Sequence, residues 1–165
     1  MRQRWLMVAV LALAIIATGC GGGVSQTALE RDLERELEIV LAPIEVKDTT
    51  CPDDLSMEVE SVFVCVSEVA DQEYEIQVTI IDAQGRFDHE RRHAVIDVVG
   101  AEIQLADEAS DDLGFRVVAD CGDNEFLVVS VGNNFTCALT DDAGHDNNIE
   151  VTVRDEDGKV SWVLS

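Results

Sequence analysis

The chain has few basic residues and no apolar run long enough to span a membrane comfortably. Its 165 residues include 11 Lys and Arg against 34 Asp and Glu, a formal charge of −23. Because phosphate recognition needs basic side chains, this balance argues against nucleic acid or anionic lipid headgroups as partners. The apolar run at residues 5–17 is shorter than the roughly 20 residues that a transmembrane helix needs. A solvated acidic surface, an affinity for cations and a basic partner all stay open.

The first 20 residues have the parts of a secretory signal. Arg2 and Arg4 precede the apolar run, and small residues lead to Cys20. Residues 17–20, Ala-Thr-Gly-Cys, resemble the lipobox of bacterial lipoproteins. That resemblance implies cleavage after residue 19 and a diacylglyceryl group on Cys20, whose two acyl chains suffice for stable anchoring. We therefore expect a signal peptide at 1–19, a lipidated cysteine with a flexible tether at 20–26, and a mature charge of −25, since removal of the signal takes away two arginines and no acid.

Four cysteines remain beyond Cys20, and they fall into two similarly spaced pairs. Cys51 and Cys65 are 14 positions apart, and Cys121 and Cys137 are 16 apart. In an exported protein, an even number of cysteines predicts disulfides, here one within each pair. A zinc site is the alternative, but the chain has no Cys-x-x-Cys spacing.

The region around each cysteine pair is repeated. Phe-x-Cys occurs at residues 63–65 and again at 135–137, and residues 76–85 align without gaps to residues 149–158. In the aligned block apolar residues alternate with polar ones and an Asp-x-x-Gly follows, a pattern that predicts a strand and a turn. The offset of 70 to 73 residues indicates that each copy is one small domain.

A helix is expected before each set of strands. Thr27 and Glu30 have the spacing of a capping box, and leucines recur every fourth residue from Leu29 to Leu41 before Pro43. Shifted by 70, the second helix begins near Asp97, and its apolar pattern, which is poorer, runs through Val99, Ile103 and Ala106. The predicted fold is therefore α+β, with repeat units at 27–95 and 96–165. In each unit an N-terminal helix packs on an antiparallel sheet of about four strands that carries one disulfide.

Both units resemble the actinobacterial family of domain of unknown function 4333, which occurs in one or two copies on lipoproteins. The likeness rests on Cys51-Pro52, on the Phe-x-Cys segments, and on the Val-Thr-x-x-Asp-x-x-Gly segments that end at Gly85 and Gly158. The resemblance implies a disulfide-bridged α+β module outside the cell membrane, and it implies no activity.

One pattern indicates catalysis. Residues 89–93, His-Glu-Arg-Arg-His, fit the zinc motif in which two histidines one helical turn apart bind the metal. The repeat instead places this segment on a returning strand, where positions four apart are separated by about 13 Å. We therefore expect no metal, no cofactor and no enzymatic activity. A zinc-dependent hydrolase that uses His89, Glu90 and His93 is the alternative.

Two acidic turns are candidates for weak calcium binding, at residues 141–146 and 155–158, although neither has the full ligand spacing of an EF-hand. The function expected from the sequence is that of a non-enzymatic binding or structural module of the cell envelope. We expect it to be held by lipid at the extracytoplasmic face of the cell membrane, with an envelope or protein partner of unknown identity.

Overall fold

The computed structural model describes residues 25–164, so the expected signal peptide and Cys20 lie outside the described residues. Within this range the chain forms two helices and ten strands. In chain order they are α1 (Gln26–Val40), β1 (Val46–Thr50), β2 (Val62–Val69), β3 (Gln72–Ile80), β4 (Phe87–Arg91), β5 (His93–Asp97), α2 (Val98–Leu113), β6 (Val117–Asp120), β7 (Phe126–Ser130), β8 (Asn134–Asp141), β9 (Asp146–Val153) and β10 (Val160–Leu164). No helix in the described part is long and apolar enough to cross a membrane.

Two four-stranded antiparallel sheets contain most of the strands, in the orders β1-β2-β3-β4 and β10-β9-β8-β6. The leucine stripe of α1 packs into one core with the inward residues of β2 and β3, among them Cys65 and Ile76. Leu105 of α2 does the same with Cys137 and Ile149 of the second sheet. The predicted α+β class, the antiparallel sheets and the two disulfides are confirmed.

The two sheets share their pairing register as well as their strand order. Cys65 faces Ile76 in the first sheet, and Cys137 faces Ile149 in the second. On the returning strands, His89 of β4 pairs with Val78 and Trp162 of β10 pairs with Val151. The repeat had placed residues 89–93 on a returning strand, and this prediction is confirmed for the part of the segment that lies on β4, whereas His93 begins β5.

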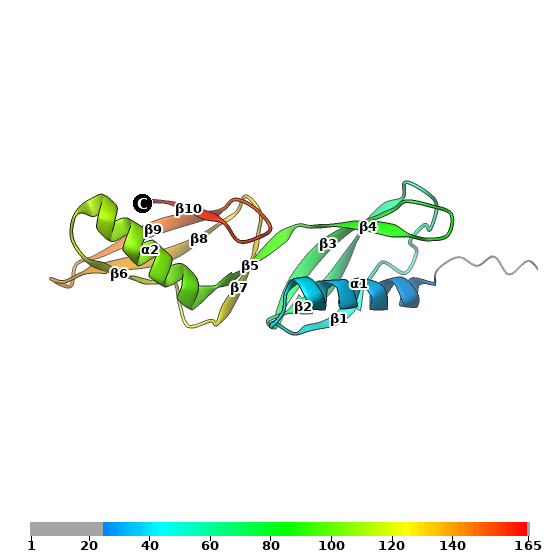
Figure 1. The fold of residues 1–165 in the computed structure, drawn as a ribbon, viewed down its shortest axis with the longest axis horizontal. Coiled ribbons are helices and arrows are strands. Elements are labelled where there is room, and N and C mark those ends of the chain that lie inside the picture. The colour runs from blue at the N-terminus through cyan, green and yellow to red at the C-terminus, as the bar shows by residue number, and fades with distance from the viewer. Residues whose placement is uncertain (1–24, 165) are drawn as a thin grey trace, which may run out of the picture.

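A two-stranded ribbon of β5 and β7 lies between the sheets, and the sequence did not predict it (Figure 1). Ala94 and Ile96 of β5 face a small core shared with α2 and β9, whereas Val95 and Val128 pack against the core of the first sheet. The ribbon therefore contributes to both cores. The expected unit boundary between residues 95 and 96 falls inside β5.

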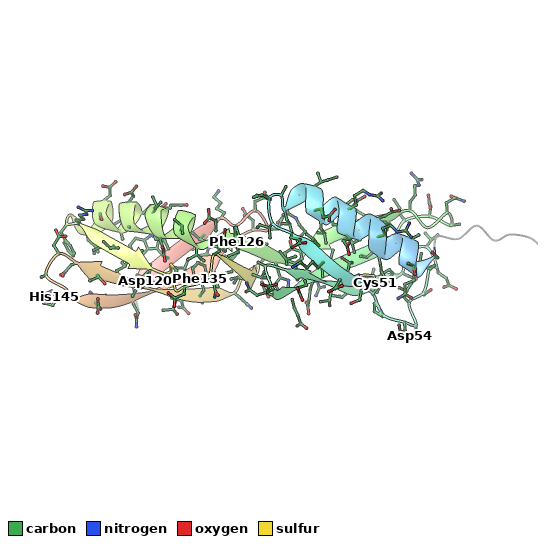
Figure 2. The ribbon with its side chains drawn as sticks, turned by 90° about the horizontal axis from the view of Figure 1, so that it is seen from below. Cys51, Asp54, Asp120, Phe126, Phe135 and His145 are labelled. Atoms are coloured by element: carbon green, nitrogen blue, oxygen red, sulfur yellow. A yellow bond between two sulfur atoms is a disulfide. The ribbon has the colours of Figure 1, made fainter. Side chains whose placement is uncertain are left out.

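The molecule is elongated, with the two sheets arranged end to end (Figure 1). Figure 2 shows both helices on one side and the sheets beneath them, with His145 at one end and Asp54 near the other. α1 begins at the end that carries Asp54, so the end that carries His145 is the one farther from the start of α1.

The start of α1 differs from the prediction. Ser25, not Thr27, is the N-cap, and its hydroxyl accepts the amide hydrogen of Ala28. Glu30 does not reach back to the cap but bonds the backbone N–H of Cys51 at 3.0 Å. The capping-box prediction was wrong because the chain enters the helix two residues earlier and Glu30 has a partner in the following strand.

The prediction for α2 was correct in position and wrong in face. Asp97 is the N-cap, as its position suggested, and its carboxylate accepts the Gly100 amide hydrogen. Val99 and Ile103 are exposed, and Ala106 lies only at the edge of the core. The buried face consists of Val98, Ala101, Leu105 and Ala109. A shift of 72 residues, the spacing from Cys65 to Cys137, would have given the correct face. It maps the leucines at 29, 33 and 37 onto Ala101, Leu105 and Ala109, whereas a shift of 70 selects a different face of the helix.

Candidate functional site

The two disulfides lie at the same place in each sheet. Cys51 follows β1 and bonds Cys65 of β2, and Cys121 follows β6 and bonds Cys137 of β8. Cys65 and Cys137 are essentially buried. Each bond therefore ties an edge strand to its inner neighbour, as expected from the spacing of the pairs.

A glutamate on each helix holds the first cysteine of each pair, a contact that the sequence reasoning missed. Glu30 accepts the N–H of Cys51, and Glu102 of α2 accepts the N–H of Cys121 at 2.8 Å. The two glutamates are separated by the same 72 residues as Cys65 and Cys137. That shared spacing is the signal by which the contact could have been found.

The histidines of the zinc-like motif lie on two strands and have separate partners. His89 of β4 has its Nδ1 atom 3.2 Å from a carboxylate oxygen of Glu36 on α1. Glu90 is exposed, as its alternating position on β4 implies. His93 begins β5 and bonds residues of β3 and β7. Among residues 25–164, no three His, Cys, Asp or Glu side chains form a group suited to a metal.

We use the name seam for the contact of the first sheet with the β5–β7 ribbon and with the turn between β9 and β10. On its first side, Gln72, Tyr74 and Arg91 project from one end of the first sheet. The Gln72 amide donates to the carbonyl of Phe126 and accepts from the N–H of Val128, so that it pairs with β7 as a strand would. The Tyr74 hydroxyl donates to the carbonyl of His93, and burial raises the pKa of this phenol.

On its second side, the seam is formed by the ribbon and by the turn between β9 and β10. Arg91 bonds the Asp157 carboxylate at 2.8 Å and the Glu156 carbonyl at 3.2 Å. Gly158 completes this turn with φ +81°, and a side chain there would meet Ile96 of β5 at 3.2 Å. Glycine is therefore favoured by the positive φ of the turn, and a side chain at this position would also be tightly packed against the ribbon.

A serine and a histidine meet at the seam, in the arrangement of a nucleophile and a base. The Ser130 hydroxyl lies 3.0 Å from Nε2 of His93, beside a hollow that also contains Arg92 and Glu156. However, Nδ1 of His93 accepts the backbone N–H of Glu75 at 3.2 Å, so the neutral ring carries its proton on Nε2. A base that activates serine needs a free nitrogen at that position. In this tautomer the pair joins β7 to β5 and does not activate Ser130.

The carboxylates of the two acidic turns are engaged by their own backbones. Asp141 accepts the N–H groups of Ala143 and His145. Asp155 accepts the N–H groups of Asp157 and Lys159. These are the bonds of an ordinary aspartate turn, and they account for both aspartates without a cation.

A second hollow, of about 280 Å³, lies at the end of the second sheet that carries His145. We call it the distal hollow. Its apolar wall consists of Leu113, Phe115, Val117, Leu139 and Leu164. Asp141, His145 and Asn147 complete its lining with polar groups.

His145 has a predictable titration. Its ring bonds Asp141 at 2.9 Å, and this bond together with the attraction of the carboxylate raises the pKa of His145 above the ordinary value of 6.5. We expect NMR titration of the imidazole to show this increase, and we expect Asp141→Asn to lower the pKa of His145 because it removes both the bond and the charge of the carboxylate. Because the folded-state pKa is raised, the contribution of the charged ring to stability is present below the unfolded-state pKa and disappears as pH rises through the folded-state value. An unchanged pKa in the variant would contradict the bond to Asp141.

The fold and the site define a class of protein, namely an α+β chain of helix-covered antiparallel sheets with disulfide-tied edge strands. Residues 8–85 match the model of a family described as Domain of unknown function (DUF4333). The matched stretch contains α1, β1, β2 and β3 with the bond from Cys51 to Cys65, so the resemblance is confirmed for the first unit. No curated protein and no solved structure matches the chain.

Proposed function

We propose that this protein is a lipid-anchored, extracytoplasmic module without catalytic activity, which contacts another component of the cell envelope. The observation that carries the proposal is the arrangement of the elongated fold. α1, which follows the expected tether directly, begins at one end, and the distal hollow lies at the other (Figures 1 and 2). An anchor at Cys20 would therefore direct the distal hollow away from the membrane.

The two disulfides support a location outside the cytoplasm, because such bonds persist in oxidising compartments. A binding or structural role is favoured over catalysis because His93, which contacts Ser130, is in the wrong tautomer to take a proton from that serine. The histidines of the zinc-like motif, which have separate partners, add no support for a hydrolase.

We further infer that the second unit is another copy of the domain of unknown function that matches residues 8–85. The equal strand order, the equal register at Cys65 and Cys137, and the matching glutamate contacts support this inference. The β5–β7 ribbon would then be an addition by which the second copy is joined to the first.

The test of this proposal is the chemistry at Cys20. We expect cells fed radioactive palmitate to label the protein, and we expect Cys20→Ser to abolish the label. Replacing residues 1–20 with a secretory signal that lacks the cysteine should release the protein from the membrane fraction. The matched control is Thr27→Ser, a similarly small change at an exposed position of α1, which should retain the label. An unlabelled protein, or one that stays in the membrane fraction without Cys20, would refute the anchor.

A further inference from the structure

The distal hollow lies at one end of the second sheet, and this end corresponds to the end of the first sheet that contacts the ribbon, which we call the seam end. Strand register establishes the equivalence, since Tyr74 pairs with Ser67 in the first sheet and Asn147 pairs with Leu139 in the second. In the same way, Arg91 faces Ile76 and Leu164 faces Ile149. The sheet end that the first unit uses to hold the ribbon thus has a counterpart at the tip of the molecule.

The two ends differ in what covers them. In the first unit, Val95 and Val128 of the ribbon pack against the core, and Tyr74 bonds the carbonyl of His93. At the tip, no part of residues 25–164 takes the place of the ribbon. Phe115 and Leu164 are each 52 % exposed there. Exposed apolar surface around a hollow is typical of a surface that a partner covers.

The charges around the two ends are also different. The first end presents Arg91, which bonds the acidic turn at Asp157. At the tip Leu164 takes the place of Arg91. Within two residues of the lining in the chain there are four exposed aspartates, Asp111, Asp112, Asp142 and Asp146, and one exposed basic residue, Arg116. The charge around the distal hollow is therefore negative on balance, and the distal hollow fits a basic segment.

We propose that the distal hollow binds an extended β-segment of a partner protein that has apolar side chains flanked by Lys or Arg. The partner would cover the hollow as the ribbon covers the seam end of the first sheet, with its basic residues meeting the aspartates. A second copy of this chain fits poorly, because the turn that docks at the seam carries Glu156 and Asp157, which the aspartates at the tip would repel. This inference rests on the proposed binding role and gives that role a site and a partner chemistry.

The probe is a fluorescent, cyclised β-hairpin peptide with valine and isoleucine on one face and lysines at both flanks. It is titrated, with fluorescence anisotropy as the readout, into the protein as its host cell processes it, held in mild detergent. We expect saturable binding that weakens at high salt. Phe115→Ser and Leu164→Ser should each weaken it roughly tenfold. Both side chains are exposed, so the fold should survive, and circular dichroism checks that it does.

The matched control is Ile103→Ser, which removes an exposed apolar residue of α2 from outside the distal hollow and should leave the affinity unchanged. A second peptide, with glutamates in place of the lysines, should bind at least tenfold more weakly. The proposal is overturned by no saturable binding, by equal binding of the two peptides, or by equal weakening in the control variant. It is also overturned if sedimentation shows a dimer that Phe115→Ser converts to monomer, because a second copy would then cover the hollow.

Failure of this inference is distinguishable from failure of the proposed function. Loss of the palmitate label would refute the anchor while leaving the peptide titration unaffected, since the distal hollow lies at the opposite end of the molecule from α1. Absence of peptide binding would leave the labelling result as it stands.

Discussion

Replacing Cys51 and Cys65 together with alanine is expected to lower the free energy of unfolding of the first unit by about 3 kcal/mol. The bond joins cysteines that are 14 positions apart and so restricts the unfolded chain. Without the bond the unfolded state has more conformational freedom, which makes unfolding more favourable. A domain of about 70 residues has only a few kcal/mol of net stability, so the loss should leave this unit marginally folded.

Tyr74 and Trp162 provide separate measurements of the two units. Tyr74 is the single tyrosine and is fully buried in the first sheet, and Trp162 lies on β10 of the second. Urea unfolding of the double variant should shift the transition seen by Tyr74 absorbance more than the one seen by Trp162 fluorescence. Replacing Cys121 and Cys137 is the matched control, and it should reverse the order. Equal shifts for both probes in both variants would mean that the units unfold as one body.

Leu33→Ala should destabilise the protein by about 2 to 5 kcal/mol, the usual range for a buried leucine. Leu33 lies at the centre of the α1 stripe with no exposed surface, in contact with the core of the first sheet. Truncation loses the transfer free energy of the side chain and leaves a cavity that neighbouring strands can fill only in part. The measurement is the midpoint of urea unfolding followed through Tyr74.

The control for Leu33→Ala is Ile39→Ala on the same helix. Ile39 is 74 % exposed, so its truncation should change stability by no more than about 0.5 kcal/mol. Because both variants place alanine on α1, helix propensity contributes little to the comparison. Similar losses in both would show that α1 is held by something other than its leucine stripe.

Sequence periodicity predicted the elements that repeat, because their patterns are local. Ile149, Val151 and Val153 alternate along β9 and are all fully buried, and the turn that ends at Gly158 leads into β10 as expected. The prediction was wrong for the face of α2. Val99 and Ile103 are the more hydrophobic candidates, but the helix turns the smaller Ala101 and Ala109 inward with Leu105.

The seam could not be predicted from the sequence because its contacts join residues that are far apart in the chain. These residues are also not at equivalent positions of the two repeats. Ser130 and His93 are 37 positions apart, and Gln72 contacts Val128 across 56. β7 also has no counterpart between β1 and β2, where the first unit has no strand. A method that searches for a repeated pattern cannot find an element that occurs once. The distal hollow was not predicted for a related reason. It is open because the ribbon covers the equivalent end of the first sheet and nothing among residues 25–164 covers this end of the second sheet.

The junction between the units contains almost no chain without regular structure. β4 ends at Arg91, β5 begins at His93, and α2 follows directly after Asp97. A protease that cuts flexible linkers would therefore find little to cut there, and the two units have little freedom to move relative to each other. Residues 25–164 should keep a nearly constant length, so under the proposed anchoring a partner at the distal hollow would be held at a fixed distance from the start of α1.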